Sequence, residues 1–81
     1  MRSPNLAFGK LIAGLRQSVG LSQEELAERA NIHRTYVSQI ERGLKSPTLV
    51  TLLRLSSALE TTPSKLMRQL ESELGLQPGQ P

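Results

Sequence analysis

The fold of this chain is decided by residues 21–43, which read LSQEELAERANIHRTYVSQIERG. Ser22 and Glu25 stand three residues apart, the spacing of a capping box, in which each side chain satisfies a backbone N–H of the first helical turn. A short helix is therefore predicted to begin at Ser22 and to end near Ala30. Asn31 then marks a tight break, because asparagine is one of the few non-glycine residues that tolerate a left-handed backbone.

A second helix is predicted from about residue 33 to residue 42, closed by Gly43, the residue type that often follows a helix C-terminus. Val37 and Ile40 lie on its inner face. Two short helices joined by so tight a turn can pack at a steep angle only where the contact positions are small, and Ala27 supplies such a side chain. The stretch is thus predicted to be a crossed helix pair.

Apolar residues ahead of this pair repeat at helical spacing, in a three–four rhythm. The predicted helix begins at Ser3-Pro4, where serine can cap and proline fits the first turn, and it ends at Gly20. Its apolar residues are Phe8, Leu11, Ile12, Leu15 and Val19.

Two further helices are predicted after the pair, and no strand is predicted, because the β-branched residues are scattered and never alternate. The first follows Ser46-Pro47-Thr48, and its inner face is predicted to hold Leu49, Leu52, Leu55 and Leu59. The second begins at Thr62-Pro63 and carries along one side Leu66, Met67, Leu70 and Leu74. The chain is predicted to be one compact all-α domain of five helices over residues 1–74, with the crossed pair at about 22–42. A glycine- and proline-rich flexible tail is predicted over 75–81.

The composition excludes several classes of function. The chain has no cysteine, and its one histidine has no aspartate to work with, so neither a disulfide framework nor a metal site is expected. No apolar run approaches the ~20 residues that span a bilayer, and no signal peptide is recognisable, so a cytoplasmic protein without membrane contact is expected. No nucleophile–base pair or phosphate loop is present, so no catalytic residue and no cofactor are predicted.

The charge is mild but unevenly placed. The net charge is +3, and residues 1–20 contain three basic residues, Arg2 among them, and no acidic one. Such a surplus on one part of a small domain suits a polyanion. The predicted outer face of the second helix of the pair adds side chains of the types that read base edges and bind phosphates, namely His33, Arg34, Thr35, Ser38, Gln39 and Arg42.

Over roughly residues 8–70 the chain resembles the phage-repressor-like (XRE or Cro/repressor) helix-turn-helix proteins. The markers are LSQEELA, YVSQIERG and PTLVTL before Ala-Leu, and the crossed pair is then the helix-turn-helix. The one departure is Asn31, where glycine is common. The resemblance implies a sequence-specific regulator of transcription whose partner is double-stranded DNA, with no small-molecule ligand. The string HRTYVSQIERG in so short a chain is also similar to restriction–modification controller proteins and to plasmid, phage and chromosomal regulators.

The resemblance implies roles for single residues. Arg34 is expected to contact a guanine edge, Gln39 to pair with adenine, and Thr35 to touch a thymine methyl or a phosphate. Ser38 is a weaker candidate for base or phosphate contact. Gln23 would bind a phosphate at the start of its helix. The residues expected to flank the groove and position the protein are Arg42, Lys45 and Thr48.

Plainer interpretations stand beside these. An arginine or glutamine on an exposed helix face is usually only solvated. His33 is as well explained by a place at the helix start as by a phosphate contact. Tyr36 is expected against the DNA backbone or a base step, or equally in the core. Arg16 and Glu41 are expected to form a structural ion pair, as such residues often do in this family.

A homodimer is expected from apolar residues that one core does not need. They lie on the last two predicted helices, at Val50, Leu53, Met67, Leu70 and Leu74. A two-fold dimer would place two reading helices about one DNA turn, ~34 Å, apart, on a pseudo-palindromic operator, and regulation could follow from the protein's own concentration. The alternative is that these residues complete the core.

Three rival functions are open at this stage. The chain could be an antitoxin-like interaction subunit whose DNA binding is autoregulatory. It could be an enzyme, although the sequence lacks the groups that catalysis needs. It could also be a structural helical bundle, against which the polar face of the reading helix argues.

Overall fold

The computed structural model describes residues 3–79, and the expected domain start at residues 1–2 and tail end at 80–81 lie outside the described residues. Within that range the fold consists of α-helices without strands, and the predicted all-α class is confirmed. The helices are α1 (Pro4–Ser18), α2 (Gln23–Ala30), α3 (Arg34–Glu41), α4 (Leu49–Ala58) and α5 (Pro63–Leu74). In residues 3–79, none of these helices has both the length and the apolarity needed to cross a membrane.

A side chain caps the start of every helix, which explains why the boundaries could be read from the sequence. The capping box of α2 is complete, since Ser22 Oγ accepts from the N–H of Glu25 at 3.0 Å and the N–H of Ser22 donates to Glu25 Oε1 at 2.9 Å. The bond from the Ser22 backbone lowers the pKa of the Glu25 carboxyl below its ordinary value of 4.5. This stabilisation is therefore present above that value and is lost as the pH falls below it. The caps of the other four helices are Ser3, His33, Thr48 and Thr62.

Two non-glycine residues in the described range have a left-handed backbone, Asn31 at φ 56° and Glu60 at φ 58°. Asn31 ends α2, as predicted, and its N–H donates to the carbonyl of Glu28 at 3.2 Å. Glu60 follows Leu59 at the end of α4, where its N–H donates to the carbonyl of Ser57 at 3.1 Å. A glutamate in this conformation costs about 1–2 kcal/mol, because its Cβ crowds the following carbonyl oxygen.

We expect Glu60→Gly to raise the free energy of unfolding by up to about 1 kcal/mol, since glycine removes that crowding at the helix end. Glu60→Ala is the control, because alanine keeps the Cβ and removes only the carboxyl group. Urea denaturation of the two variants and the wild type measures the difference. Equal stability of the glycine and alanine variants would contradict strain at this position.

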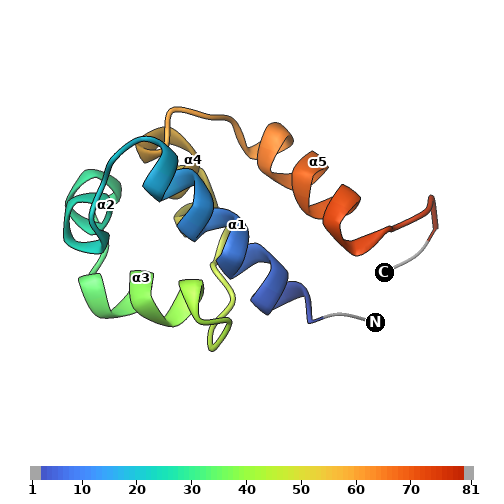
Figure 1. The fold of residues 1–81 in the computed structure, drawn as a ribbon, viewed down its shortest axis with the longest axis horizontal. Helices are drawn as coiled ribbons and strands as arrows, with labels where there is room; N and C mark the ends of the chain where they lie inside the picture. The colour runs from blue at the N-terminus through green and yellow to red at the C-terminus, as the bar shows by residue number, and fades with distance from the viewer. Residues whose placement is uncertain (1–2, 80–81) are drawn as a thin grey trace.

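The five helices pack in the pairs α1–α3, α2–α3, α1–α5, α2–α4 and α4–α5, and the core lies between them. Figure 1 shows α1 in the middle, with α3 along one side of it and α5 along the other. The largest fully buried apolar side chains come from all five helices: Ile12, Leu26, Ile40, Leu55, Leu66 and Val37. Val37 and Ile40, predicted on the inner face of α3, and Ala27, predicted at the contact of the pair, are all buried, and so are Leu26 and Ala30 of α2.

Two expectations about the core were wrong. Leu49 was placed on the inner face of α4, but it is 80% exposed, and that position of the helix faces solvent. The buried face of α4 instead includes Thr51 and Ser56. Val19, placed in the apolar rhythm of α1, follows the end of that helix and is exposed. The helical spacing alone does not distinguish these residues from the buried leucines.

The packing of α1 on α3 depends on one glycine whose role was not predicted from the sequence. Gly9 is buried in α1, and a Cβ at this position would overlap the carbonyl oxygens of Ile40 and Glu41 at the end of α3. The backbones of the two helices therefore approach as closely as glycine allows. A glycine inside an otherwise regular helical pattern, flanked by core residues, is the signal that could have identified this contact.

Candidate nucleic-acid interface

The helix α3 lies at the edge of the fold (Figure 1), and it includes the predicted DNA-reading residues Arg34, Thr35, Ser38 and Gln39. Arg34 and Thr35, in its first turn, are exposed, and so is Arg42 at its end. Ser38 and Gln39 are half-buried. The residues at the start of the helix are thus those most available to a partner, as expected of a helix that enters a groove with its N-terminus leading.

His33 is the N-cap of α3, which agrees with the plainer of its two interpretations. Its Nδ1 accepts a hydrogen bond from the N–H of Thr35 at 3.0 Å. The ring proton of the neutral side chain is then on Nε2, and because the residue is exposed this N–H can donate to a partner. His33 therefore holds the start of α3 and keeps one donor for a further contact.

Tyr36 is half-buried and packs against the core, so its ring is not a free surface group. Its hydroxyl donates to the carbonyl of Ser46 at 3.3 Å, and Ser46 Oγ donates to Asn5 Oδ1 at 2.5 Å. These two bonds tie the loop between α3 and α4 to α3 on one side and to the start of α1 on the other. That loop carries Lys45, which is exposed.

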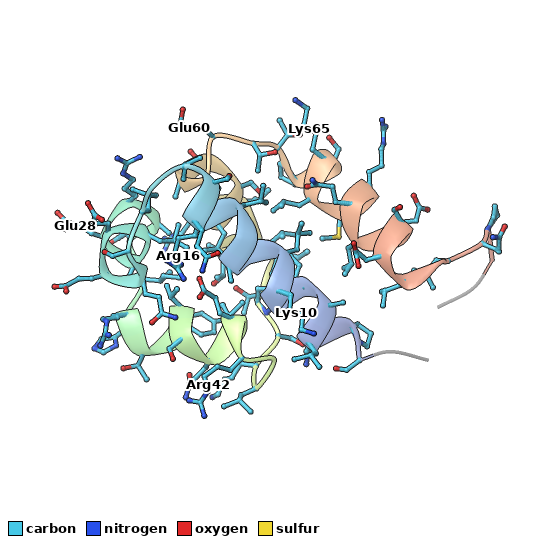
Figure 2. The ribbon with its side chains drawn as sticks, viewed as in Figure 1. Lys10, Arg16, Glu28, Arg42, Glu60 and Lys65 are labelled. Carbon is cyan, nitrogen blue, oxygen red and sulfur yellow. The ribbon has the colours of Figure 1, made fainter. Side chains whose placement is uncertain are left out.

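Thr48 also has a local role, because its Oγ1 accepts from the N–H of Thr51 at 3.1 Å and caps α4. The Thr48 hydroxyl also donates a hydrogen bond to Thr51 Oγ1 at 3.0 Å. Two exposed cations lie in this region: Arg42 at the end of α3 and Lys45 in the loop that follows. Figure 2 shows Arg42 on the α3 side of the molecule and Lys65 on the opposite side, beside α5.

Arg16 and Glu41 form an ion pair between α1 and α3, the pair expected from the sequence. Arg16 Nε donates to Glu41 Oε2 at 2.7 Å and Nη2 donates to Oε1 at 3.1 Å, while Nη1 donates to the carbonyl of Leu21 at 2.8 Å. The two side chains are only 13% and 6% exposed. Figure 2 shows Arg16 in the interior between helices, in contrast to the outward Lys10 and Arg42.

Gln23 belongs to the same network, which the sequence analysis did not foresee. It is the first residue of α2, half-buried, and its Nε2 donates to Glu41 Oε1 at 2.9 Å. Glutamine in the first turn of a helix indicates nothing about such a partner, because the partner lies 18 residues further along the chain. Among residues 3–79, no three histidine, cysteine or acidic residues are grouped so as to hold a metal ion.

A family model described as helix-turn-helix matches residues 12–66, which is most of the fold described above. The chain belongs to the helix-turn-helix family. The chain is 41% identical to control protein C.SmaI of Serratia marcescens over 66 residues, which cover 79% of each chain. Control protein C.BamHI of Bacillus amyloliquefaciens is 40% identical over 63 residues, 76% of this chain and 78% of the relative.

Solved structures of similar proteins superpose on most of this chain. The restriction-modification controller protein C.AhdI from Aeromonas hydrophila is 38% identical and gives a TM-score of 0.77, over 80% of this chain and 98% of that one. A mutant of the controller protein C.Esp1396I, bound to its highest affinity operator site, is 26% identical and gives a TM-score of 0.83, over 94% and 100% of the two chains. This helix-turn-helix protein is a DNA-binding regulator of transcription, as the sequence predicts.

Proposed function

We propose that this regulator binds a pseudo-palindromic operator as a two-fold dimer and controls the genes of a restriction–modification system, its own among them. It acts by binding alone, without catalysis. The observation that carries the proposal is the exposed, polar first turn of α3, with Arg34 at its start. The likeness to control proteins C.SmaI and C.BamHI supports the class of regulated gene.

The residues proposed to contact DNA fall into two groups. Arg34, Thr35 and Gln39 lie on α3 and read base edges, with Ser38 beside them. The second group positions the protein on the sugar–phosphate backbone, with His33 donating through Nε2 and Gln23 through its amide. The other members of that group are Arg42, Lys45 and Thr48.

We expect Arg34→Ala to weaken operator binding by about 1–3 kcal/mol and to relax the preference at one base pair of each half-site, because a bidentate guanine contact is lost. The matched control is Lys45→Ala, which removes the same charge from the loop. That variant should weaken binding to every sequence alike and lower the salt slope by about 1. Iterative selection from random duplexes, followed by titrations at several salt concentrations, measures both effects.

A different pair of results would contradict the proposed function. If selection with the wild type recovers no motif, and both variants lose the same salt-dependent affinity, the protein does not regulate a specific operator. The antitoxin-like function, in which a protein partner comes first, would then take its place.

The dimer is proposed to form through α4. Leu49 is 80% exposed, and Val50 and Leu53 are each 57% exposed, so three large apolar side chains lie on the outer face of one helix. Met67 on α5 is also exposed, whereas Leu70 packs against the core and Leu74 is half-buried. An apolar patch of this kind on a small domain is typical of an interface. Leu49 is added to the residues expected from the sequence.

We expect Leu53→Glu to give a monomer that binds a full operator far more weakly than the wild type, because one domain contacts only one half-site. Val19→Glu is the control, since Val19 is an exposed apolar residue at the end of α1 and lies outside the patch. Sedimentation velocity gives the oligomeric state. A dimer that survives Leu53→Glu would exclude the α4 interface.

A further inference from the structure

Glu41 has more hydrogen-bond partners than a structural ion pair requires. Its Oε2 accepts from Arg16 Nε, and its Oε1 accepts both from Arg16 Nη2 and from Gln23 Nε2. The side chain is 6% exposed and lies at the end of α3, with its partners on α1 and α2. One carboxylate therefore joins α1 to α2 and α3, the two helices that carry proposed DNA-contact residues.

We propose that Glu41 is a positioning residue for DNA binding, which aims the amide of Gln23 at a backbone phosphate. This inference rests on the proposed function of Gln23. An ionised carboxylate only accepts hydrogen bonds, so the Gln23 amide must turn its Nε2 towards Glu41. The amide nitrogen carries two N–H groups, and the second is left to donate to the phosphate.

The energetic reason is pre-organisation. A free glutamine at the surface samples many rotamers, and ordering it on the DNA costs affinity. The bond to Glu41 orders the side chain before DNA arrives, and bonds to a charged acceptor are stronger than neutral ones. Positioning groups of this kind act by holding a contact residue in its productive geometry.

Arg16 is also needed for this positioning role, because it neutralises the charge of Glu41. An uncompensated carboxylate close to a phosphate would repel it, since both groups are negative. The two bonds from the guanidinium of Arg16 neutralise Glu41 and hold its plane, so that the carboxylate orders Gln23 without opposing the DNA.

The direction in which Glu41→Gln changes the DNA affinity distinguishes the positioning role from a purely electrostatic effect. Glu41→Gln removes a negative charge, which by itself should strengthen DNA binding and steepen its salt dependence. If Glu41 positions Gln23, the same substitution weakens binding, by about 2- to 10-fold, because Gln23 loses its charged acceptor. Glu28→Gln is the matched control, since Glu28 is an exposed glutamate on α2. It should bind as well as the wild type or more tightly.

The deciding experiment measures operator affinity for the wild type, Gln23→Ala, Glu41→Gln and the double variant, with circular dichroism showing each protein folded at the assay temperature. Gln23→Ala should bind more weakly at every salt concentration with an unchanged salt slope, because a neutral amide displaces no counterion. Glu41→Gln should weaken the wild type but have no such effect once Gln23 is alanine. Equal losses in both backgrounds, or a tighter Glu41→Gln variant, would overturn the proposal.

A second measurement needs no variant. In the free wild-type protein the NMR order parameter of the Gln23 side-chain amide should be near the rigid value of about 0.85, and that of Gln17, exposed on α1, below about 0.6. A mobile Gln23 would refute the pre-organisation even if Glu41→Gln failed to fold. A wild type that selects no operator would instead overturn the proposed function, and the positioning role with it.

Discussion

Gly9→Ala is expected to destabilise the protein by about 3 kcal/mol or more, at or beyond the upper end of the usual cost of overpacking a core. The added Cβ would meet backbone atoms of α3, with the carbonyl oxygen of Glu41 at 2.6 Å, and a carbonyl oxygen cannot turn away as a flexible side chain can. The two helices would have to move apart, and the packing that holds α3 against α1 would be lost. For a domain of this size the Tm should fall by more than about 10 °C.

The same helix offers a matched control. Gly14 lies five residues further along α1, where an added Cβ would meet nothing within 4 Å. Gly14→Ala should therefore stabilise the protein by about 0.5–1 kcal/mol, because alanine loses less backbone entropy in a helix. Thermal unfolding followed by circular dichroism should thus give opposite signs for the two variants. A stable Gly9→Ala protein would mean that α1 and α3 do not approach each other this closely.

Glu41→Ala is expected to destabilise the protein by about 3–5 kcal/mol, the typical cost of removing one partner of a buried ion pair. The change leaves the guanidinium of Arg16, only 13% exposed, with the carbonyl of Leu21 as its remaining partner, and it also leaves the Gln23 amide without its acceptor. Small domains are stable by only about 5–15 kcal/mol, so much of the total is at risk.

A double-mutant cycle tests whether the loss belongs to the pair. Arg16→Met together with Glu41→Leu should be far less destabilising than the two single changes added together, because no unpaired charge remains buried. Glu28→Ala, on the exposed face of α2, should change the stability by no more than about 0.5 kcal/mol. Urea denaturation measures all five variants, Glu41→Ala among them. A loss for Glu41→Ala no larger than that for Glu28→Ala would show that the pair contributes little to folding.

Most of the helix-turn-helix was predictable because its signals are local. The capping box at Ser22 and Glu25 and the left-handed Asn31 each act within a few residues, and the structure has them where the sequence analysis expects them. The buried face of α2 and α3 was predictable for a related reason. The apolar residues of those short helices lie on one side only, so the helical period allows only one face to be the buried one.

The buried face of α4 was not predictable in the same way. Apolar residues occur all round this helix, so its periodicity is satisfied by more than one rotation. The structure buries Thr51 and Ser56 and exposes Leu49. The burial of these two hydroxyl groups is tolerated because both form hydrogen bonds. Ser56 Oγ donates to the carbonyl of Leu52 at 2.8 Å, and Thr51 Oγ1 accepts from Thr48 at 3.0 Å.

The sequence by itself determined where each helix begins, where the chain turns, and which face of α3 is polar, because caps, turns and a one-sided apolar pattern are properties of neighbouring residues. Only the tertiary structure decided which side of α4 faces solvent, how closely Gly9 lets α1 approach α3, and that Gln23 shares Glu41 with Arg16. The last two outcomes depend on groups 18 to 32 residues apart, and all three are set by how the helices pack on one another.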